Sequence, residues 1–333
     1  MVPLKYYLGV DAGGSKTYAL VTDQYGNVLG MGEAGNGNHQ TGYDIARRNI
    51  GQAVDTALHI AALTPDEIEH ACFGLAGADR ETDFKVLRPM IAALGFPRHS
   101  IVCDTQIALR AGTTRPYGVV LICGSGTNSA GRNRQGDFFQ CGGFSYLFGD
   151  FGGGGALSVE VFRSVIRAWD GREIPTMLTG LLLEVLQYNN VDEMLDDYLD
   201  HNLTPPIHIA KLAFEAAMKG DKVAQDILTH QGEELGKSAC AVIRRLGMEG
   251  ETFDLVLAGS IVTRGEGDFI HAPIAAAVKR VAPGVNLVKL AVEPVVGAVW
   301  MALESSGEAL SPEAYSQLKT IQEFHSITMT KRV

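Results

Sequence analysis

The sequence predicts an α/β protein that consists of two similar domains, and three observations lead to this prediction. The chain has 333 residues, which is more than one ordinary core accommodates and fits two domains of roughly 150 residues each. Short strand patterns joined by tight turns open the chain near residue 5 and occur again after residue 117. After each opening, helical patterns alternate with single strands, as is typical of α/β folds.

The first half has the predicted order βββαβαβα. Residues 5–11 are apolar and extended, residues 17–23 alternate, and the turn at 24–27 leads to a short third strand. A helix follows, in which apolar residues recur at helical spacing between Ile45 and Ala61. We then expect a strand at 70–75, a helix that ends near Gly95, a strand at 100–103 and a helix from Thr105.

The second half begins with a buried strand at 117–123 and two more strands at 129–132 and 137–141. Residues 175–247 are mostly helical, and the clearest helix begins near Asp221. A strand at 253–258, a helix, a short strand at 285–288 and a helix from about 295 complete the chain. We therefore expect one domain at 1–115 and a second at 116–294. The second carries a helical insertion at about 155–247, and the last helix packs back on the first domain.

Composition and charge exclude several classes of protein. The net charge of −10 argues against binding to nucleic acid or anionic membranes, both of which favour basic patches. No apolar run approaches the roughly 20 residues of a membrane helix, and the N-terminus lacks the pattern of a signal peptide. Five scattered cysteines without a CxxC pair argue against disulfides, a metal site or an iron–sulfur cluster. We expect a cytoplasmic protein with reduced thiols.

The first motif that indicates chemistry is VDAGGSKT, residues 10–17. A buried strand ends at Asp11, and the glycines that follow let the chain reverse under a phosphate chain, where backbone N–H groups form an anion nest. Asp11 can hold Mg²⁺ through a water, and the turn itself comprises Gly13, Gly14, Ser15, Lys16 and Thr17. The motif is neither a Walker A sequence nor a Rossmann fingerprint, because a strand follows it. A plain β-hairpin with a glycine turn remains the alternative.

Two further glycine turns follow buried strands. LICGSGTNS, residues 121–129, again opens a group of three strands, and two such turns could hold a triphosphate between two domains. LAGSI, residues 257–261, places Gly259 and Ser260 after a strand, where a nucleoside could lie against bare backbone. Asp104 follows the apolar strand 101–103, at the end where ligands bind in α/β sheets. Its alternative role is the N-cap of the next helix.

These motifs resemble the phosphate-1, phosphate-2 and adenosine motifs of the sugar kinase, Hsp70 and actin superfamily. More narrowly, the whole chain is similar to the N-acetylglucosamine kinase group of the BadF/BadG-type ATPase family. Seven elements match in order over about 300 residues, and each alone is weak. They are Asp11 to Thr17, Asn38-His39, Leu75 to Asp79, Asp104, Gly124 to Asn128, Cys141 to Gly143, and Gly149-Asp150.

The resemblance implies two actin-like ATPase (ribonuclease H-like) domains with an interdomain cleft. It also implies phosphoryl transfer from ATP, with Mg²⁺, to an amino sugar, with N-acetylglucosamine and its O6 hydroxyl as the expected acceptor, and a homodimer. Asp104 would be the general base, and Asp11 would hold Mg²⁺ through water. The implied sugar contacts are Asn38, His39, Asp79, Asp104, Cys141, Gly142, Gly143 and Asp150. The implied ATP contacts are Gly13, Gly14, Ser15, Lys16, Thr17, Gly124, Ser125, Gly126, Thr127, Gly259 and Ser260.

The chain departs from the family pattern near the expected sugar pocket. Gln40 replaces a Trp, Phe144 and Ser145 replace Trp and Gly, and Phe151 replaces an acid. Glucosamine, N-acetylmuramic acid or another hexose therefore remain alternative substrates. A BadF-type activator ATPase of a 2-hydroxyacyl-CoA dehydratase is the rival function, but it needs cysteines that ligate an iron–sulfur cluster. A sugar-binding regulator is a second rival, and we expect no helix-turn-helix before Lys5.

Overall fold

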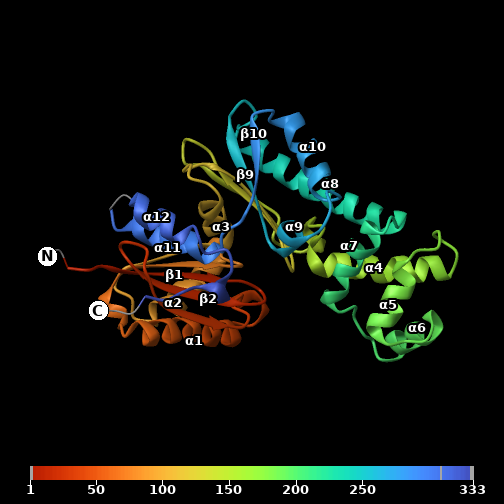
Figure 1. Cartoon of the computed structure of the whole chain (residues 1–333), viewed down its shortest axis with the longest axis horizontal. Coiled ribbons are helices and arrows are strands. Elements are labelled where there is room, and N and C mark those ends of the chain that lie inside the picture. The colour runs from red at the N-terminus through yellow and green to blue at the C-terminus, as the bar shows by residue number, and fades with distance from the viewer. Residues whose placement is uncertain (1–2, 308–309, 331–333) are drawn as a thin grey trace. The chain divides into compact units, whose positions relative to one another are not determined.

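The computed structural model describes residues 3–307 and 310–330, and the chain divides into two compact units. Among the described residues, the first unit comprises the chain up to Val120, residues 134–136 and the chain from Val288 onward. The second unit comprises residues 121–133 and 137–287. Figure 1 labels many of the elements of both units. Within the described ranges, no helix is both long and apolar enough to cross a membrane.

The first unit is built on one five-stranded sheet with the order β3-β2-β1-β4-β5. Its strands are β1 (Tyr6–Ala12), β2 (Thr17–Asp23), β3 (Val28–Ala34), β4 (Ile68–Leu75) and β5 (His99–Cys103). β1 pairs antiparallel with β2 and parallel with β4, and β4 pairs parallel with β5. β1, β4 and β5 therefore end at the same edge of the sheet, and the residues that follow them meet there.

Helices cover both faces of this sheet (Figure 1). They are α1 (Tyr43–Ala61), α2 (Glu81–Ala92), α3 (Asp104–Gly112), α11 (Pro294–Ser305) and α12 (Pro312–Leu318), with 3₁₀ turns at His39–Thr41, Pro65–Glu67 and Phe324–Ser326. The strand period of two decides which core a residue joins. Leu8 belongs to the core cluster that contains Ile50 of α1, whereas Tyr7 belongs to the cluster on the other face, which contains Val299 of α11.

Glycines let the helices approach the sheet closely. A Cβ on Gly32 of β3 would lie 1.9 Å from the Ala53 carbonyl oxygen of α1, and one on Gly30 would lie 2.0 Å from that of Ala57. These distances are far inside van der Waals contact, so α1 can rest on β3 only because both positions lack a side chain. These glycines are needed for packing rather than for ligand binding.

The second unit contains the sheet β10-β9-β6-β7-β8. Its strands are β6 (Gly118–Cys123), β7 (Thr127–Arg132), β8 (Phe138–Cys141), β9 (Phe253–Ala258) and β10 (Val285–Lys289). Its helices are α4 (Gly153–Trp169), α5 (Leu178–Leu186), α6 (Val191–Asp200), α7 (Lys211–Met218), α8 (Lys222–Arg245), α9 (Ser260–Arg264) and α10 (His271–Val281), with 3₁₀ turns at Tyr146–Phe148 and Ile207–Ala210. β7 and β8 pair antiparallel, with Ser129 opposite Cys141.

Two helices differ from the sequence prediction. α4 begins inside the four-glycine run, at Gly153, where low helix propensity gave no signal. There the Gly154 amide donates to the Gly124 carbonyl (2.7 Å), so a tertiary contact decides where the helix begins. α12 was not expected either, although the sequence has its start signal: the Ser311 side chain accepts from the Ala314 amide and Pro312 occupies the first turn.

Candidate functional site

Three carboxylates gather at the edge where β1, β4 and β5 end. Asp11 lies near the end of β1, Asp79 follows β4, and Asp104 follows β5 directly. The Cys103 thiol donates to both neighbours, at 3.3 Å to Asp79 Oδ1 and 3.1 Å to Asp104 Oδ1. α3 begins at Asp104 with Cys103 as its N-cap residue. Asp104 is therefore already helical, one residue earlier than the sequence suggested, and is not the cap.

The protonation of these acids is perturbed by their surroundings. Burial raises the pKa of Asp11 to about 7, and repulsion from Asp104 adds to the rise. Burial also raises the pKa of Asp104, opposed by the Cys103 hydrogen bond and supported by repulsion from Asp79. Buried carboxylates with raised pKa values are typical of proton acceptors and of groups that await a cation.

The first glycine turn joins β1 to β2 and leaves its tip in solvent. Gly13 N–H donates to the Lys16 carbonyl at 2.9 Å, which closes the turn, and Gly14, Ser15 and Lys16 are exposed. Thr17 has a different role, because it is buried and its hydroxyl donates to the Gly35 carbonyl at 2.8 Å. The Lys16 ammonium lies 4.1 Å from the centre of the Tyr18 ring and 4.0 Å from Glu293.

Asn38 and His39 belong to a polar cluster in the same unit. The Asn38 side chain accepts from the Gln40 amide at 2.9 Å, and the Gln40 side chain donates to the Gly77 carbonyl at 3.3 Å. The His39 side chain is only 7% exposed, with Nε2 3.5 Å from Asp83 Oδ1. Gln40, which replaces the family's Trp, thus ties the Asn-His segment to the loop after β4.

Asp83, which sequence reasoning missed, holds this cluster together. It lies in the first turn of α2, almost fully buried, and accepts hydrogen bonds from Arg80 and Gln40. Burial alone would raise the pKa of Asp83, but these hydrogen bonds outweigh it and the pKa lies below its usual value. The available signal was the spacing of Arg80 and Asp83, which forms a capping box at the start of α2.

In the second unit, the two predicted ATP-binding turns lie against each other. Gly124 N–H donates to the Gly126 carbonyl at 2.9 Å, and Gly259 at the start of α9 follows β9. A Cβ on Gly259 would lie 2.4 Å from the Cys123 carbonyl oxygen. The start of α4 completes this group, because the Gly154 and Gly155 amides donate to the Gly124 and Ser125 carbonyls. Sequence reasoning assigned α4 no part in it.

The predicted sugar contacts of the second unit also come together. Asp150 Oδ2 accepts from the Phe144 and Ser145 amides at 2.6 Å each, and a Cβ on Gly142 would lie 2.4 Å from Asp150 Oδ1. Gly143 lies against the Asn128 side chain, whose Oδ1 is buried without a hydrogen-bond partner. Asn128 belongs to the second glycine turn, and the sequence predicts no contact for it. Burial and the charge of Asp150 raise the pKa of Cys141.

A family model for the BadF/BadG/BcrA/BcrD ATPase family matches residues 8–302. This match spans most of the chain and every motif described above. The chain belongs to this family. Both units of this BadF/BadG-type ATPase are mixed α/β, as the sequence predicted, and solved structures with the same fold include a ROK family glucokinase.

The ATPase is similar in sequence to two sugar kinases. It is 29% identical over 314 residues to the N-acetyl-D-glucosamine kinase of Dictyostelium discoideum. This alignment covers 90% of this chain and 98% of the relative. It is 28% identical over 263 residues to the N-acetylmuramic acid/N-acetylglucosamine kinase of Clostridium acetobutylicum, with 78% and 86% covered. It shares its fold with the crystal structure of a proposed N-acetylglucosamine kinase from Chromobacterium violaceum, with a TM-score of 0.67, 22% identity, and 90% and 99% covered.

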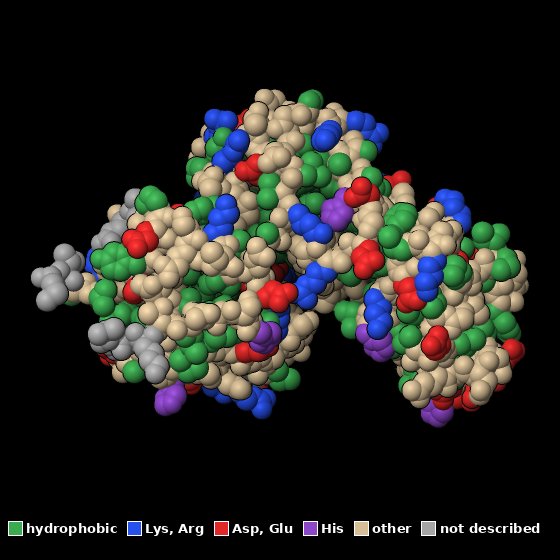
Figure 2. Space-filling view, in the orientation of Figure 1, with side chains coloured by type: hydrophobic (Ala, Val, Ile, Leu, Met, Phe, Trp, Pro, Cys, Tyr) green, Lys and Arg blue, Asp and Glu red, His purple; other side chains and the backbone are tan. Residues whose placement is uncertain are grey.

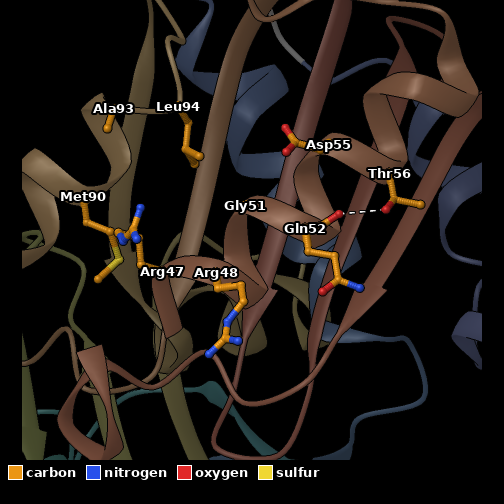
Figure 3. A pocket seen from close by; sticks show the side chains of 9 residues that line it. All are labelled: Arg47, Arg48, Gly51, Gln52, Asp55, Thr56, Met90, Ala93 and Leu94. Carbon is orange, nitrogen blue, oxygen red and sulfur yellow. Dashed lines mark hydrogen bonds between the residues drawn. The ribbon is translucent and has the colours of Figure 1, made fainter. Parts of the chain in front are cut away.

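A groove elsewhere on the ATPase contains none of the predicted site residues. It lies between α1 and α2, with Arg47, Arg48 and Gln52 on one side and Met90 and Leu94 on the other (Figure 3).

All five cysteines are free thiols. Among the described residues, no three His, Cys, Asp or Glu side chains converge as metal ligands. On the face shown in Figure 2, acidic and basic side chains are interspersed on both units.

Proposed function

We propose that this ATPase transfers the γ-phosphoryl group of ATP to a hydroxyl of an amino sugar, with N-acetylglucosamine as the first candidate and its O6 as the acceptor. The observation that carries the proposal is the half-buried Asp104 at the carboxyl end of β5, with a raised pKa. Homology supports the reaction type, because the three curated relatives that match are all sugar kinases, and the matches cover at least 86% of each of them.

In this mechanism the Asp104 carboxylate accepts the proton of the sugar hydroxyl as its oxygen attacks the γ-phosphorus and ADP leaves. A raised pKa makes the carboxylate a stronger base, and general base catalysis works best when that pKa approaches the working pH. The Cys103 thiol, whose single proton is shared between Asp79 and Asp104, orients both groups. Phosphoryl transfer depends on such positioning and on charge stabilisation rather than on covalent chemistry by the protein.

The phosphates would lie along the backbone of two turns. The amides of the exposed residues Gly14 and Ser15 in the first unit, and of Ser125 and Gly126 in the second, are the expected donors. Gly259 and Ser260, packed on the second turn, would lie along the adenosine. Lys16 supplies a positive charge next to the first turn.

Asp11 fits a magnesium ion held through water. Its half-buried carboxylate has a pKa raised to about 7, and Lys16 is its main opposing charge. Mg²⁺ takes oxygen ligands and keeps several waters, so a single carboxylate such as that of Asp11 can hold the ion through water. The ion would neutralise charge on the phosphates.

We also propose a cytoplasmic homodimer with domains at 1–115 and 116–294.

A coupled assay of ADP release over a panel of sugars tests this proposal. The panel contains N-acetylglucosamine, N-acetylmuramic acid, glucosamine and glucose, each with ATP and Mg²⁺. We expect N-acetylglucosamine to give the highest kcat/KM. ADP release that is indifferent to every sugar would contradict a kinase. An iron assay on the same preparation addresses the activator ATPase, because stoichiometric iron bound to the free thiols would support that rival instead.

A further inference from the structure

The loop that follows the predicted sugar contacts of the second unit exposes a run of apolar side chains. Tyr146, Leu147 and Phe148 are 80%, 83% and 70% exposed. A single exposed apolar side chain is ordinary, but three large ones in sequence form a patch that typically marks a binding surface. The 144–148 loop is therefore an unusual feature in a protein whose other apolar residues largely fill its cores.

This loop has a defined conformation. The Phe144 and Ser145 amides both donate to Asp150 Oδ2 at 2.6 Å, and the Phe148 amide donates to the Ser145 carbonyl at 3.0 Å. Ser145 has a φ of 94°, a conformation that residues with a side chain rarely adopt. Backbone strain of this kind persists only where the surroundings enforce it, and it is concentrated at ligand-binding sites.

The same carboxylate links the loop to the predicted sugar contacts. Asp150 holds the base of the loop through Oδ2. Its Oδ1 lies so close to Gly142 that a Cβ on Gly142 would be only 2.4 Å from it. Gly142 and Gly143 both have positive φ, so this strand end turns sharply into the loop. A sugar bound at Gly142 and Gly143 would consequently have the apolar side chains beside it.

We infer that the 144–148 loop is an apolar flap that contacts an apolar substituent on the amino sugar. The preferred substrate class is therefore an amino sugar with a longer N-acyl chain. This inference rests on the proposed function. Asp150 acts as a positioning residue for the flap. Glucosamine should be the poorest substrate, because its ammonium would lose hydration against an apolar surface without gaining a partner.

The test compares kcat/KM for N-acetylglucosamine with two kinds of substituted sugar. One is N-butanoylglucosamine, and the other is the pair of phenyl N-acetylglucosaminides, α and β. Burying one methylene is equivalent to about fourfold in affinity. We expect N-butanoylglucosamine to exceed N-acetylglucosamine by about fourfold or more. A gain with the phenyl N-acetylglucosaminides alone would place the contact at C1 and contradict a contact with the acyl chain.

Variants then assign the gain to the loop. The triple change Tyr146→Ser, Leu147→Ser and Phe148→Ser should abolish the preference for the substituted sugar. Leu199→Ser is the matched control, because Leu199 is 71% exposed on α6 and lies outside the loop. Asp150→Asn should lower the preference and accelerate hydrogen exchange of the Phe144 and Ser145 amides. Binding of the substituted sugar without ATP should protect residues 144–148 of the unaltered protein from hydrogen exchange.

Each other outcome has a defined meaning. If no sugar is phosphorylated by the unaltered protein, the proposed function itself is wrong. If N-acetylglucosamine is phosphorylated but neither kind of substituted sugar gains, only the flap is wrong. The flap is equally wrong if the triple variant lowers kcat/KM for every sugar by the same factor, which would indicate a lid. A triple variant with an altered oligomeric state and no altered preference would show that a second copy covers the loop.

Discussion

Asp104 combines two properties that a general base needs. It lies at the end of a strand where the sheet opens, and its burial raises its pKa. Cys103 contributes to the arrangement as an orienting donor, and burial keeps its own pKa well above the usual value, so that it stays a neutral thiol. A neutral donor between two carboxylates reduces their repulsion without adding charge. The chemistry assigned to Asp104 can be tested directly.

Asp104→Asn should fold normally and bind ATP within a few-fold of the unaltered protein. It should lose about 10²–10⁴-fold in kcat, because an amide cannot accept the hydroxyl proton. Steady-state kinetics with the best sugar and calorimetric titration with an ATP analogue measure the two effects. Asp66→Asn, on an exposed turn, is the control. More than about a tenth of the original kcat would mean that Asp104 is not the base.

Asp11 predicts a pH-dependent stability. Its folded pKa of about 7 lies above the ordinary value of 3.8, so its stabilising contribution is present at low pH and is lost as pH rises towards 7. Asp11→Asn removes this loss. In EDTA at pH 8 the variant should melt about 2–6 °C above the unaltered protein, and the difference should shrink at pH 4.5. Added Mg²⁺ should also shrink it at pH 8; an equal Tm for both proteins at pH 8 would refute the prediction.

At the scale of elements, the second unit brings its glycine turns into backbone contact. The turn after β6 and the turn after β9 lie side by side because Gly259 has no side chain, and the start of α4 donates to the first of them. Each turn alone has the pattern of an ordinary loop. Their contact makes a continuous stretch of exposed backbone that suits phosphate and nucleoside.

Gly259→Ala should separate these turns. Its Cβ would lie 2.4 Å from the Cys123 carbonyl, and its φ of 91° is strained for alanine. We expect a loss of about 1–3 kcal/mol in the free energy of unfolding, together with weaker ATP binding. Gly250→Ala is the matched control, because nothing lies within 4 Å of its Cβ. Chemical denaturation and ATP titration report both effects, and full retention of both would disprove the role of this contact.

At the scale of the whole molecule, the two phosphate turns belong to different units. Gly13 is part of the first unit and Gly124 part of the second. We propose that both turns hold one triphosphate and that closure around it excludes water that would otherwise hydrolyse ATP. We expect sugar binding to be the signal for closure, because the expected sugar contacts include Asn38 of the first unit and Gly142 of the second.

ATP hydrolysis should therefore be slow without sugar and rise by at least about tenfold when the right sugar is present. Small-angle scattering should show the molecule contracting at saturating sugar. ADP release measured with and without sugar provides the first test. Fast hydrolysis without sugar, or a scattering profile that saturating sugar leaves unchanged, would count against closure.

The sequence by itself determined the fold class, the order of most elements and the family, because these depend on local patterns. Strand periodicity, glycine turns after buried strands and Asp104 after an apolar strand are all properties of short segments. Only the tertiary structure decided that the Thr17 side chain is buried and hydrogen-bonded, and that the His39 side chain lies beside Asp83. It also decided that Asp83 holds a polar cluster together and that α4 begins in a glycine run. These features depend on contacts between segments distant in the chain, and no local pattern contains such contacts.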